Sequence, residues 1–115
     1  MDVNRSRTPE QATRQELRLL LSSIEAATGA DRELDKAICE GLGLKDADLT
    51  GDAVASHEAV GQLLPRSQLR VGYDVRGILP RATLEQEGAR YDAVAPTVPL
   101  AIWRVAVAAL IDPKS

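Results

Sequence analysis

The stretch VPLAIWRVAVAALI, residues 98–111, decides the fold of this 115-residue chain. Wound as a helix, it places apolar side chains on nearly every side, with Arg104 as its one charged residue. A helix that is apolar all round must be buried. Thr97 is its candidate N-cap, and Pro113 follows its last turn. The stretch is shorter than the roughly 20 residues that a membrane span needs, so the sequence predicts a core helix.

The residues before this helix predict a small antiparallel sheet. The first strand, 69–75, has an apolar residue at every second position, as a half-buried strand does. Those residues are Leu69, Val71, Tyr73 and Val75. Residues 78–86 predict a second strand, which Pro80 restricts to an edge or a late start. Residues 87–88 predict a tight turn into a third strand, 89–95, which completes a three-stranded meander.

Two short helices and a loop are expected immediately before the sheet. Asp31 is the expected cap of the first, which repeats apolar residues every four positions until the Gly-Leu-Gly sequence at 41–43 ends it. Residues 45–55 carry no helical or strand period and predict a loop. Ser56 is then the expected N-cap of the second helix, and Pro65 stops it.

A longer helix, 8–28, is expected near the start of the chain, after a flexible polar tail over residues 1–7. Thr8 is its expected N-cap, Gln11 completes a capping box, and Gly29 is expected to end it in the left-handed conformation. Its apolar stripe consists of Leu17, Leu20, Leu21 and Ile24. The sequence leaves open whether this stripe packs on the chain's own domain or on a partner.

Three helices, three strands and a last helix, in that order, predict an α+β fold. We expect a helix-sheet-helix sandwich in which a three-stranded antiparallel meander packs against helices, the buried last helix among them. Residues 29–115 are expected to form this single domain, and helix 8–28 to be an addition to it. The 44% hydrophobic and 27% charged composition is typical of a globular chain.

The composition also argues against several kinds of function. With no Phe, one Trp and two Tyr, the chain lacks the aromatic platform that binds single-stranded nucleic acid. Cys39 is the single cysteine, which fits a reducing compartment. No apolar segment near the N-terminus has the pattern of a signal peptide. We therefore expect a cytoplasmic protein that binds neither nucleic acid nor membranes.

Catalytic and metal-binding patterns are weak. His57, the single histidine, is the sequence neighbour of Ser56, and such neighbours make a poor nucleophile-base pair. One Cys and one His cannot complete a zinc shell. The aspartates of the 45–55 loop lack the glycine and terminal glutamate of a calcium loop. We expect a non-enzymatic protein without a cofactor or a metal.

Charge is unevenly distributed along the chain. Residues 25–58 hold nine acids against three bases. We expect this acidic segment and the helix before it to bind a partner with a basic surface. The residues assigned to this interface are Arg14, Arg18, Asp31, Glu33, Asp35, Asp46, Asp48 and Asp52. Arg70 and Arg81, if they share the outer face of the sheet, offer a second surface for an acidic partner.

Two stretches resemble a known family. GADRELDKAICEGLG, 29–43, and APTVPLAIWRVAVAAL, 95–110, resemble the opening and closing segments of the phage ABA sandwich domain, found in small phage and prophage proteins. The matching positions are Leu34, Asp35, Ile38, Glu40 and Gly43 in an LDxxIxExxG helix, Ser56 as a helix cap, and Thr97, Pro99, Leu100, Ala101 and Ala108 in a TPxLAxxxAxL helix. The resemblance implies a phage or prophage origin and helix-sheet-helix layering, and it brings no catalytic residues. Helix 8–28 departs from the family pattern.

These observations favour a phage or prophage accessory protein that acts by binding a host protein. One concrete form is an inhibitor of a bacterial defence effector, comparable to an anti-CRISPR protein, which covers a basic groove with its own acidic surface. A first alternative is a module that binds a small ligand or a nucleotide on the arginine-bearing sheet. A second is a virion or morphogenesis component that forms a homodimer through helix 8–28.

Overall fold

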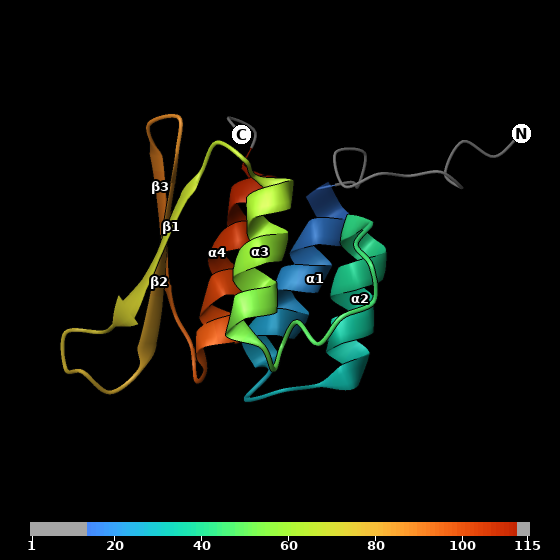
Figure 1. Ribbon diagram of the computed structural model, residues 1–115, viewed down its shortest axis with the longest axis horizontal. Helices are drawn as coiled ribbons and strands as arrows, with labels where there is room; N and C mark the ends of the chain where they lie inside the picture. The colour runs from blue at the N-terminus through green and yellow to red at the C-terminus, as the bar shows by residue number, and fades with distance from the viewer. Residues whose placement is uncertain (1–13, 113–115) are drawn as a thin grey trace, which may run out of the picture.

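The computed structural model of the chain describes residues 14–112. Its elements are α1 (Arg14–Ala26), α2 (Arg32–Leu42), α3 (Ala53–Leu63), β1 (Gln68–Tyr73), β2 (Pro80–Gln86), β3 (Ala89–Val94) and α4 (Val98–Ile111). The strands form one antiparallel sheet in the order β1-β2-β3, and all four helices lie on one side of it (Figure 1). The predicted α+β sandwich with its meander is therefore confirmed.

Helix α4 is the centre of the core. Thr97 caps it by accepting a hydrogen bond from the Leu100 amide, as predicted. Strands β2 and β3 pack on one side of α4, and α1 and α3 pack on other sides. Its buried residues are Pro99, Leu100, Ala101, Ile102, Trp103, Val105, Ala106, Val107 and Ala109. The last helix is thus buried on most sides, as its apolar composition requires, while Arg104, Ala108 and Ile111, which lie on one stripe, are half-buried.

Helix α1 packs within the chain, against α4 and α2. Leu17 and Ile24 of its apolar stripe are buried in the common core. Two arginines fix its ends: Arg14 donates from Nε to the Ile111 carbonyl at 3.2 Å, and Arg104 donates to the Glu25 carbonyl at 2.9 Å. Of the two roles that the sequence left open for the stripe, packing on the chain's own domain is the one observed.

The ends of α1 differ in part from the sequence prediction. The helix ends at Ala26, and Gly29 is not among the residues with positive φ, so the predicted left-handed end at Gly29 is wrong. Ala27 instead donates its amide to the Ile24 carbonyl at 3.2 Å, which closes the last turn. The predicted tail, together with Thr8 and Gln11, lies outside the described residues.

The caps of α2 and α3 are aspartates. Asp31 accepts from the amides of α2's first turn, and Gly43 ends that helix at φ 69°, both as predicted, although Gly41 lies inside the helix rather than ending it. Helix α3 begins earlier than expected, because Asp52 caps it at Ala53. The prediction that Ser56 caps this helix is wrong.

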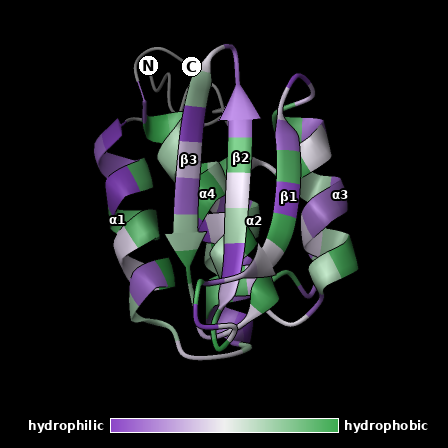
Figure 2. Ribbon diagram, turned by 90° about the vertical axis from the view of Figure 1, so that its left-hand side faces the viewer, coloured by the Kyte–Doolittle hydropathy of each residue, from purple (hydrophilic) through white to green (hydrophobic). Residues whose placement is uncertain are grey.

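The register of the sheet sorts its side chains onto two faces. Arg70 pairs with Thr83, and Gly72 pairs with Arg81. Paired residues of an antiparallel ladder point to the same side, and so do residues two apart along a strand. Arg70 and Arg81 therefore share the outer face, which is turned toward the reader in Figure 2. The inner face carries Ala82 and Leu84, which are fully buried against the helices.

Strand β1 lacks most of this cover. Helix α4 packs chiefly beneath β2 and β3 and makes few contacts with β1. Val71 is 43% exposed and Tyr73 is 63% exposed, while Val75 lies beyond the strand and is 96% exposed. The predicted half-buried strand over 69–75 is therefore shorter than expected, and its second half is uncovered.

Candidate interaction surface

Most of the aspartates that the sequence assigned to a partner shape the backbone instead. Asp31 accepts from the amides of Glu33 and Leu34. Asp52 accepts from two amides at the start of α3, and Asp48 accepts from the Gly51 amide at 3.1 Å. A carboxylate at a helix N-terminus satisfies amides that have no partner within the helix, and it interacts favourably with the helix dipole. These three acids would have a structural role in the absence of any partner.

The prediction that Asp35 contacts a partner is wrong. Asp35 is fully buried, at 0% exposure, so it cannot touch a partner while the chain is folded. Its Oδ1 accepts from the Thr50 amide at 2.7 Å and from the Thr50 hydroxyl at 2.6 Å. Its Oδ2 accepts from Arg32 at 3.1 Å. The buried carboxylate therefore holds the loop before α3 against α2.

The remaining residues assigned to the acidic interface lie on α1, on α2 and in the loop after α2. Arg14 donates a hydrogen bond to the Ile111 carbonyl at the end of α4, and Asp46 lies 3.4 Å from the Arg32 guanidinium. Glu33 and Arg18 are exposed on different helices. Five of the six acids assigned to the interface are therefore held by contacts within the chain, namely Asp31, Asp35, Asp46, Asp48 and Asp52, while Glu33 is exposed.

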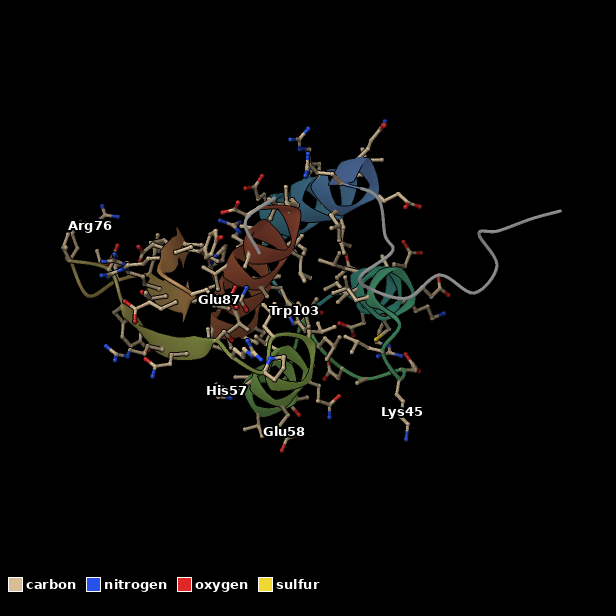
Figure 3. All side chains as sticks on the ribbon, turned by 90° about the horizontal axis from the view of Figure 1, so that it is seen from above. Lys45, His57, Glu58, Arg76, Glu87 and Trp103 are labelled. Carbon is tan, nitrogen blue, oxygen red and sulfur yellow. The ribbon has the colours of Figure 1, made fainter. Side chains whose placement is uncertain are left out.

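Ser56 and His57 do not form a catalytic pair. Ser56 is buried, and its Oγ accepts from the indole Nε1 of Trp103 at 2.9 Å. The same hydroxyl lies 2.5 Å from the Leu49 carbonyl, to which it donates. His57 is exposed and projects away from this contact, while Trp103 lies inside the helical layers (Figure 3). A buried tryptophan needs an acceptor for its N–H, and this was the one signal in the sequence for such a polar partner.

Cys39 is a packing residue. It is buried, and its Sγ donates to the Lys45 carbonyl at 3.2 Å. Burial raises the pKa of the thiol above its ordinary value. The thiol thus stays protonated at neutral pH, and a protonated thiol is a poor nucleophile.

The outer face of the sheet carries three arginines, of which two are paired. Asp92 lies 2.9 Å from Arg81 and 3.3 Å from Arg90. The pKa of Asp92 is lowered, first because the Thr83 hydroxyl donates to its carboxylate and then because Arg81 does. The side chain of Arg70 has no ion pair or hydrogen bond with any residue between 14 and 112. Arg70 is thus the available cation of this face.

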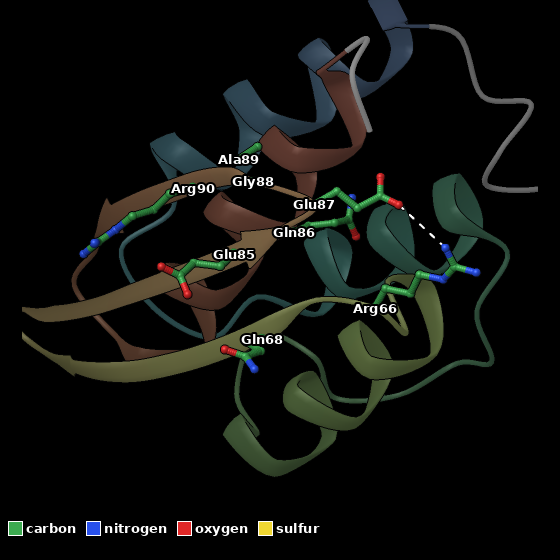
Figure 4. A pocket seen from close by; sticks show the side chains of 8 residues that line it. All are labelled: Arg66, Gln68, Glu85, Gln86, Glu87, Gly88, Ala89 and Arg90. Atoms are coloured by element: carbon green, nitrogen blue, oxygen red, sulfur yellow. Dashed lines mark ion pairs between the residues drawn. The ribbon is translucent and has the colours of Figure 1, made fainter.

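Two shallow hollows on this face differ in charge. One, of 230 Å³, is lined by Arg70, Arg81 and Arg90 with uncharged neighbours. The other, of 410 Å³, lies at the turn between β2 and β3 (Figure 4). There Arg66 faces Glu87 at 3.8 Å, and Glu85 adds a second acid. The turn hollow is mixed in charge and offers no preference for an anion.

Strand β1 also has a free edge. The Asp74 amide donates to the Leu79 carbonyl of the facing strand segment at 2.8 Å. Alternate residues of an antiparallel ladder turn their backbone groups toward the same neighbour. The amides and carbonyls of Leu69, Val71 and Tyr73 therefore point away from β2, and no described residue bonds to them. The other edge of the sheet differs, because Arg104 donates to the Val94 carbonyl at 2.7 Å.

Exposed apolar side chains gather next to this edge. Six large hydrophobic residues are exposed among residues 14–112, and four of them lie in the segment 71–78. These four are Val71, Tyr73, Val75 and Ile78. We call them, with Arg70, the β1 surface. The alternating pattern of 69–75 was visible in the sequence, but its exposure depends on where α4 lies.

The loop that carries Val75 and Ile78 is built around Asp74. Its carboxylate accepts from the amides of Ile78 at 2.9 Å and Leu79 at 3.4 Å, and Arg76 lies 3.4 Å away. The Ile78 amide is the first cause of the lowered pKa of Asp74. The turn thus holds the exposed end of the β1 surface in a defined shape, at the end of the molecule far from α1 and α2 (Figure 3).

Acid is expected to destabilise the fold in part through Asp74 and Asp92. Because both pKa values are lowered in the folded state, the unfolded chain binds these protons at higher pH. Their contribution is present above the unfolded pKa of about 3.9 and is lost as the pH falls through the folded pKa. Urea unfolding between about pH 5 and 2 should show a smaller loss of stability in Asp92→Asn than in the original chain. Equal losses in the two proteins would contradict this expectation.

Within residues 14–112, no helix is long and apolar enough to cross a lipid bilayer. In the same range, no three His, Cys, Asp or Glu side chains are placed to hold a metal ion. No known family, curated protein or solved structure matches this chain. The resemblance to the phage ABA sandwich domain therefore stays a prediction.

Proposed function

We propose that this chain acts by binding another protein, through the β1 surface. The observation that carries the proposal is the clustering of four exposed apolar side chains in one short segment beside a free strand edge. Exposed apolar residues are ordinary when scattered singly, but a contiguous group is typical of an interaction site. The other two, Leu19 and Val54, lie singly on α1 and α3.

Protein binding is the kind of function that the sequence predicted. The proposed surface, however, is the β1 surface and not the acidic segment 25–58. The acidic segment was expected to contact the partner, but its aspartates cap helices, are buried, or are bonded to Arg32 or to a backbone amide of the chain. The narrower form, a phage or prophage accessory protein that inhibits a defence effector in the bacterial cytoplasm, was expected from the family resemblance and from the acidic charge of residues 25–58. We retain it as a hypothesis about the identity of the partner.

A phosphate-bearing ligand on the outer face of the sheet is the second candidate. It is favoured by the observation that Arg70 and Arg81 share that face. Against it, Asp92 already pairs with Arg81 and Arg90, so a bound phosphate would have to compete with a carboxylate. Stabilisation of the fold by nucleotides would argue for this candidate, since a ligand that binds only the folded state raises its stability.

The proposal predicts that capture of a partner depends on the β1 surface. The tagged chain should recover a partner from a bacterial lysate, and the Val75→Ser, Ile78→Ser double variant should lower the recovery at least about tenfold. Both side chains are exposed, so the double variant should keep its fold. Recovery should survive high salt, because apolar contacts are not screened as ion pairs are.

Leu19→Ser is the matched control for this experiment. Leu19 is 63% exposed, close to the exposure of Ile78, but it lies on α1. We expect the control to recover the partner as the original chain does. Equal recovery by the double variant and the control would count against the β1 surface.

A further inference from the structure

We infer that the partner contributes an extended segment that pairs with the free edge of β1 and alternates acidic and apolar side chains. This inference rests on the proposed function, and it adds the chemistry of what is bound. Three features of β1 carry it: the outward backbone groups, the exposed inner side chains, and the unpaired arginine on the outer face.

The backbone of β1 offers a ladder for one more strand. Leu69, Val71 and Tyr73 each present an outward amide and an outward carbonyl. Such edges invite pairing with another chain, and soluble proteins commonly block them with a proline, a bulge or a covering segment. No described residue covers this edge, and β1 contains no proline. The edge is therefore open to an added strand over at least three alternate residues.

The inner face of β1 favours apolar side chains on the inner face of an added strand. Val71 and Tyr73 point to the helical side of the sheet and remain largely exposed there. In an added strand, the side chains opposite them would lie about 4.5–5.5 Å away between Cβ atoms. Apolar residues at those positions would remove both faces of the contact from water, which is favourable. Val75 and Ile78, in the loop after the strand, are two further exposed apolar side chains.

The outer face of β1 favours an acidic side chain in the added strand, opposite Arg70. Arg70 projects on the opposite side of β1 from Val71 and has no partner among the described residues. A cross-strand acid would pair with it, whereas a basic residue in the same place would be repelled. Because side chains alternate along a strand, the acid falls between two apolar residues of the added segment.

A single strand fits this edge better than a second copy of the chain. Helix α3 stands on the helical side of the sheet next to β1 (Figures 1 and 2). Two copies joined edge to edge would each bring an α3 into the region beneath the new sheet. An extended segment brings only its own backbone and side chains.

The test uses amide hydrogen exchange with synthetic peptides on the full chain. With the peptide TEVEIET in excess, the amides of Leu69, Val71 and Tyr73 should exchange at least about fivefold more slowly, because each gains a hydrogen bond. The amides of Arg70 and Gly72 already face β2 and should change less. The matched peptide TKVKIKT should give no protection. Protection without this alternation, or equal protection by both peptides, would overturn the inference.

A pair of variants tests the backbone contact separately from the side chain. Val71→Pro removes an outward amide without breaking the β1-β2 ladder, whereas Val71→Thr keeps that amide. We expect the proline variant to bind TEVEIET at least about fivefold more weakly than the threonine variant. Equal binding would overturn edge pairing.

The outcomes separate this inference from the proposed function. If the Val75→Ser, Ile78→Ser variant loses its partner but TEVEIET protects no alternate amides, the β1 surface binds protein without edge pairing. Sedimentation of the chain alone as a dimer that Val71→Pro dissociates would also overturn the inference, because a second copy would then occupy the edge.

Discussion

Replacing Trp103 with alanine is expected to cost about 3–5 kcal/mol of stability. Trp103 is fully buried at the centre of α4 and is the largest fully buried side chain between residues 14 and 112. Its removal takes away apolar contact area, leaves a cavity, and removes the N–H that the Ser56 hydroxyl accepts. Since small domains are stable by only about 5–15 kcal/mol, urea unfolding should show a chain near its limit of stability.

Two milder variants separate the contribution of apolar packing from that of the indole hydrogen bond. Trp103→Phe keeps most of the apolar volume and removes the N–H donor, whereas Ser56→Ala keeps the indole and leaves that donor without its acceptor. Each is expected to cost about 1–3 kcal/mol, less than Trp103→Ala. Similar midpoints of urea unfolding for Trp103→Ala and the original chain would show that the indole is not a core residue.

Asp35→Ala is the second substitution with a large expected effect. It leaves the buried Thr50 amide and hydroxyl without their acceptor and leaves Arg32 without one of its two carboxylates. Because the Arg32 side chain is 58% exposed, the loss comes mainly from the buried Thr50 donors, and leaving a buried donor unsatisfied costs about 1–3 kcal/mol. We expect a lower midpoint in urea unfolding, and faster exchange of the Thr50 amide, which donates to this carboxylate.

Glu33→Ala is the matched control, since Glu33 is an exposed acid in the same turn of α2. Its effect should stay within about 0.5 kcal/mol. Loss of binding in Asp35→Ala would therefore report unfolding rather than a partner contact. Stability of Asp35→Ala equal to that of the control would contradict the role of the buried carboxylate.

Local patterns predicted the elements well, because their causes are local. Thr97 and Asp31 lie directly before apolar helical stretches, and Gly43 supplies the left-handed conformation that follows one. Residues 87–88 both adopt positive φ, which is the backbone requirement of the tight turn expected there. In such cases a few neighbouring residues are enough to determine the cap or the turn.

The prediction of the N-cap of α3 failed because two nearby residues could each cap the helix. Asp52 and Ser56 are both good caps, and the residues between them are compatible with either helix start. In the fold Asp52 is the cap, and Ser56 instead accepts, from within α3, the N–H of Trp103, which lies 47 positions away in sequence. The sequence does not show this pairing, because it depends on the tertiary contact between α3 and α4.

The candidate surface was harder to predict than the fold. Counting acids between residues 25 and 58 could not separate a free carboxylate from the capping Asp31 or the buried Asp35. The alternation in 69–75 is the same whether helices cover the strand or not. Only the position of α4 beneath β2 and β3 shows that Val71 and Tyr73 are left exposed.

The joining of α1 to α4 through Arg14 and Arg104 has a consequence for synthesis of the chain. A ribosome completes α1 before it begins α4, and at about 5–20 residues per second the delay lasts on the order of 4–15 seconds. Throughout that delay Leu17 and Ile24 lack the helix that contributes most to their cover. The apolar side of the first helix therefore stays in contact with water until α4 has been made.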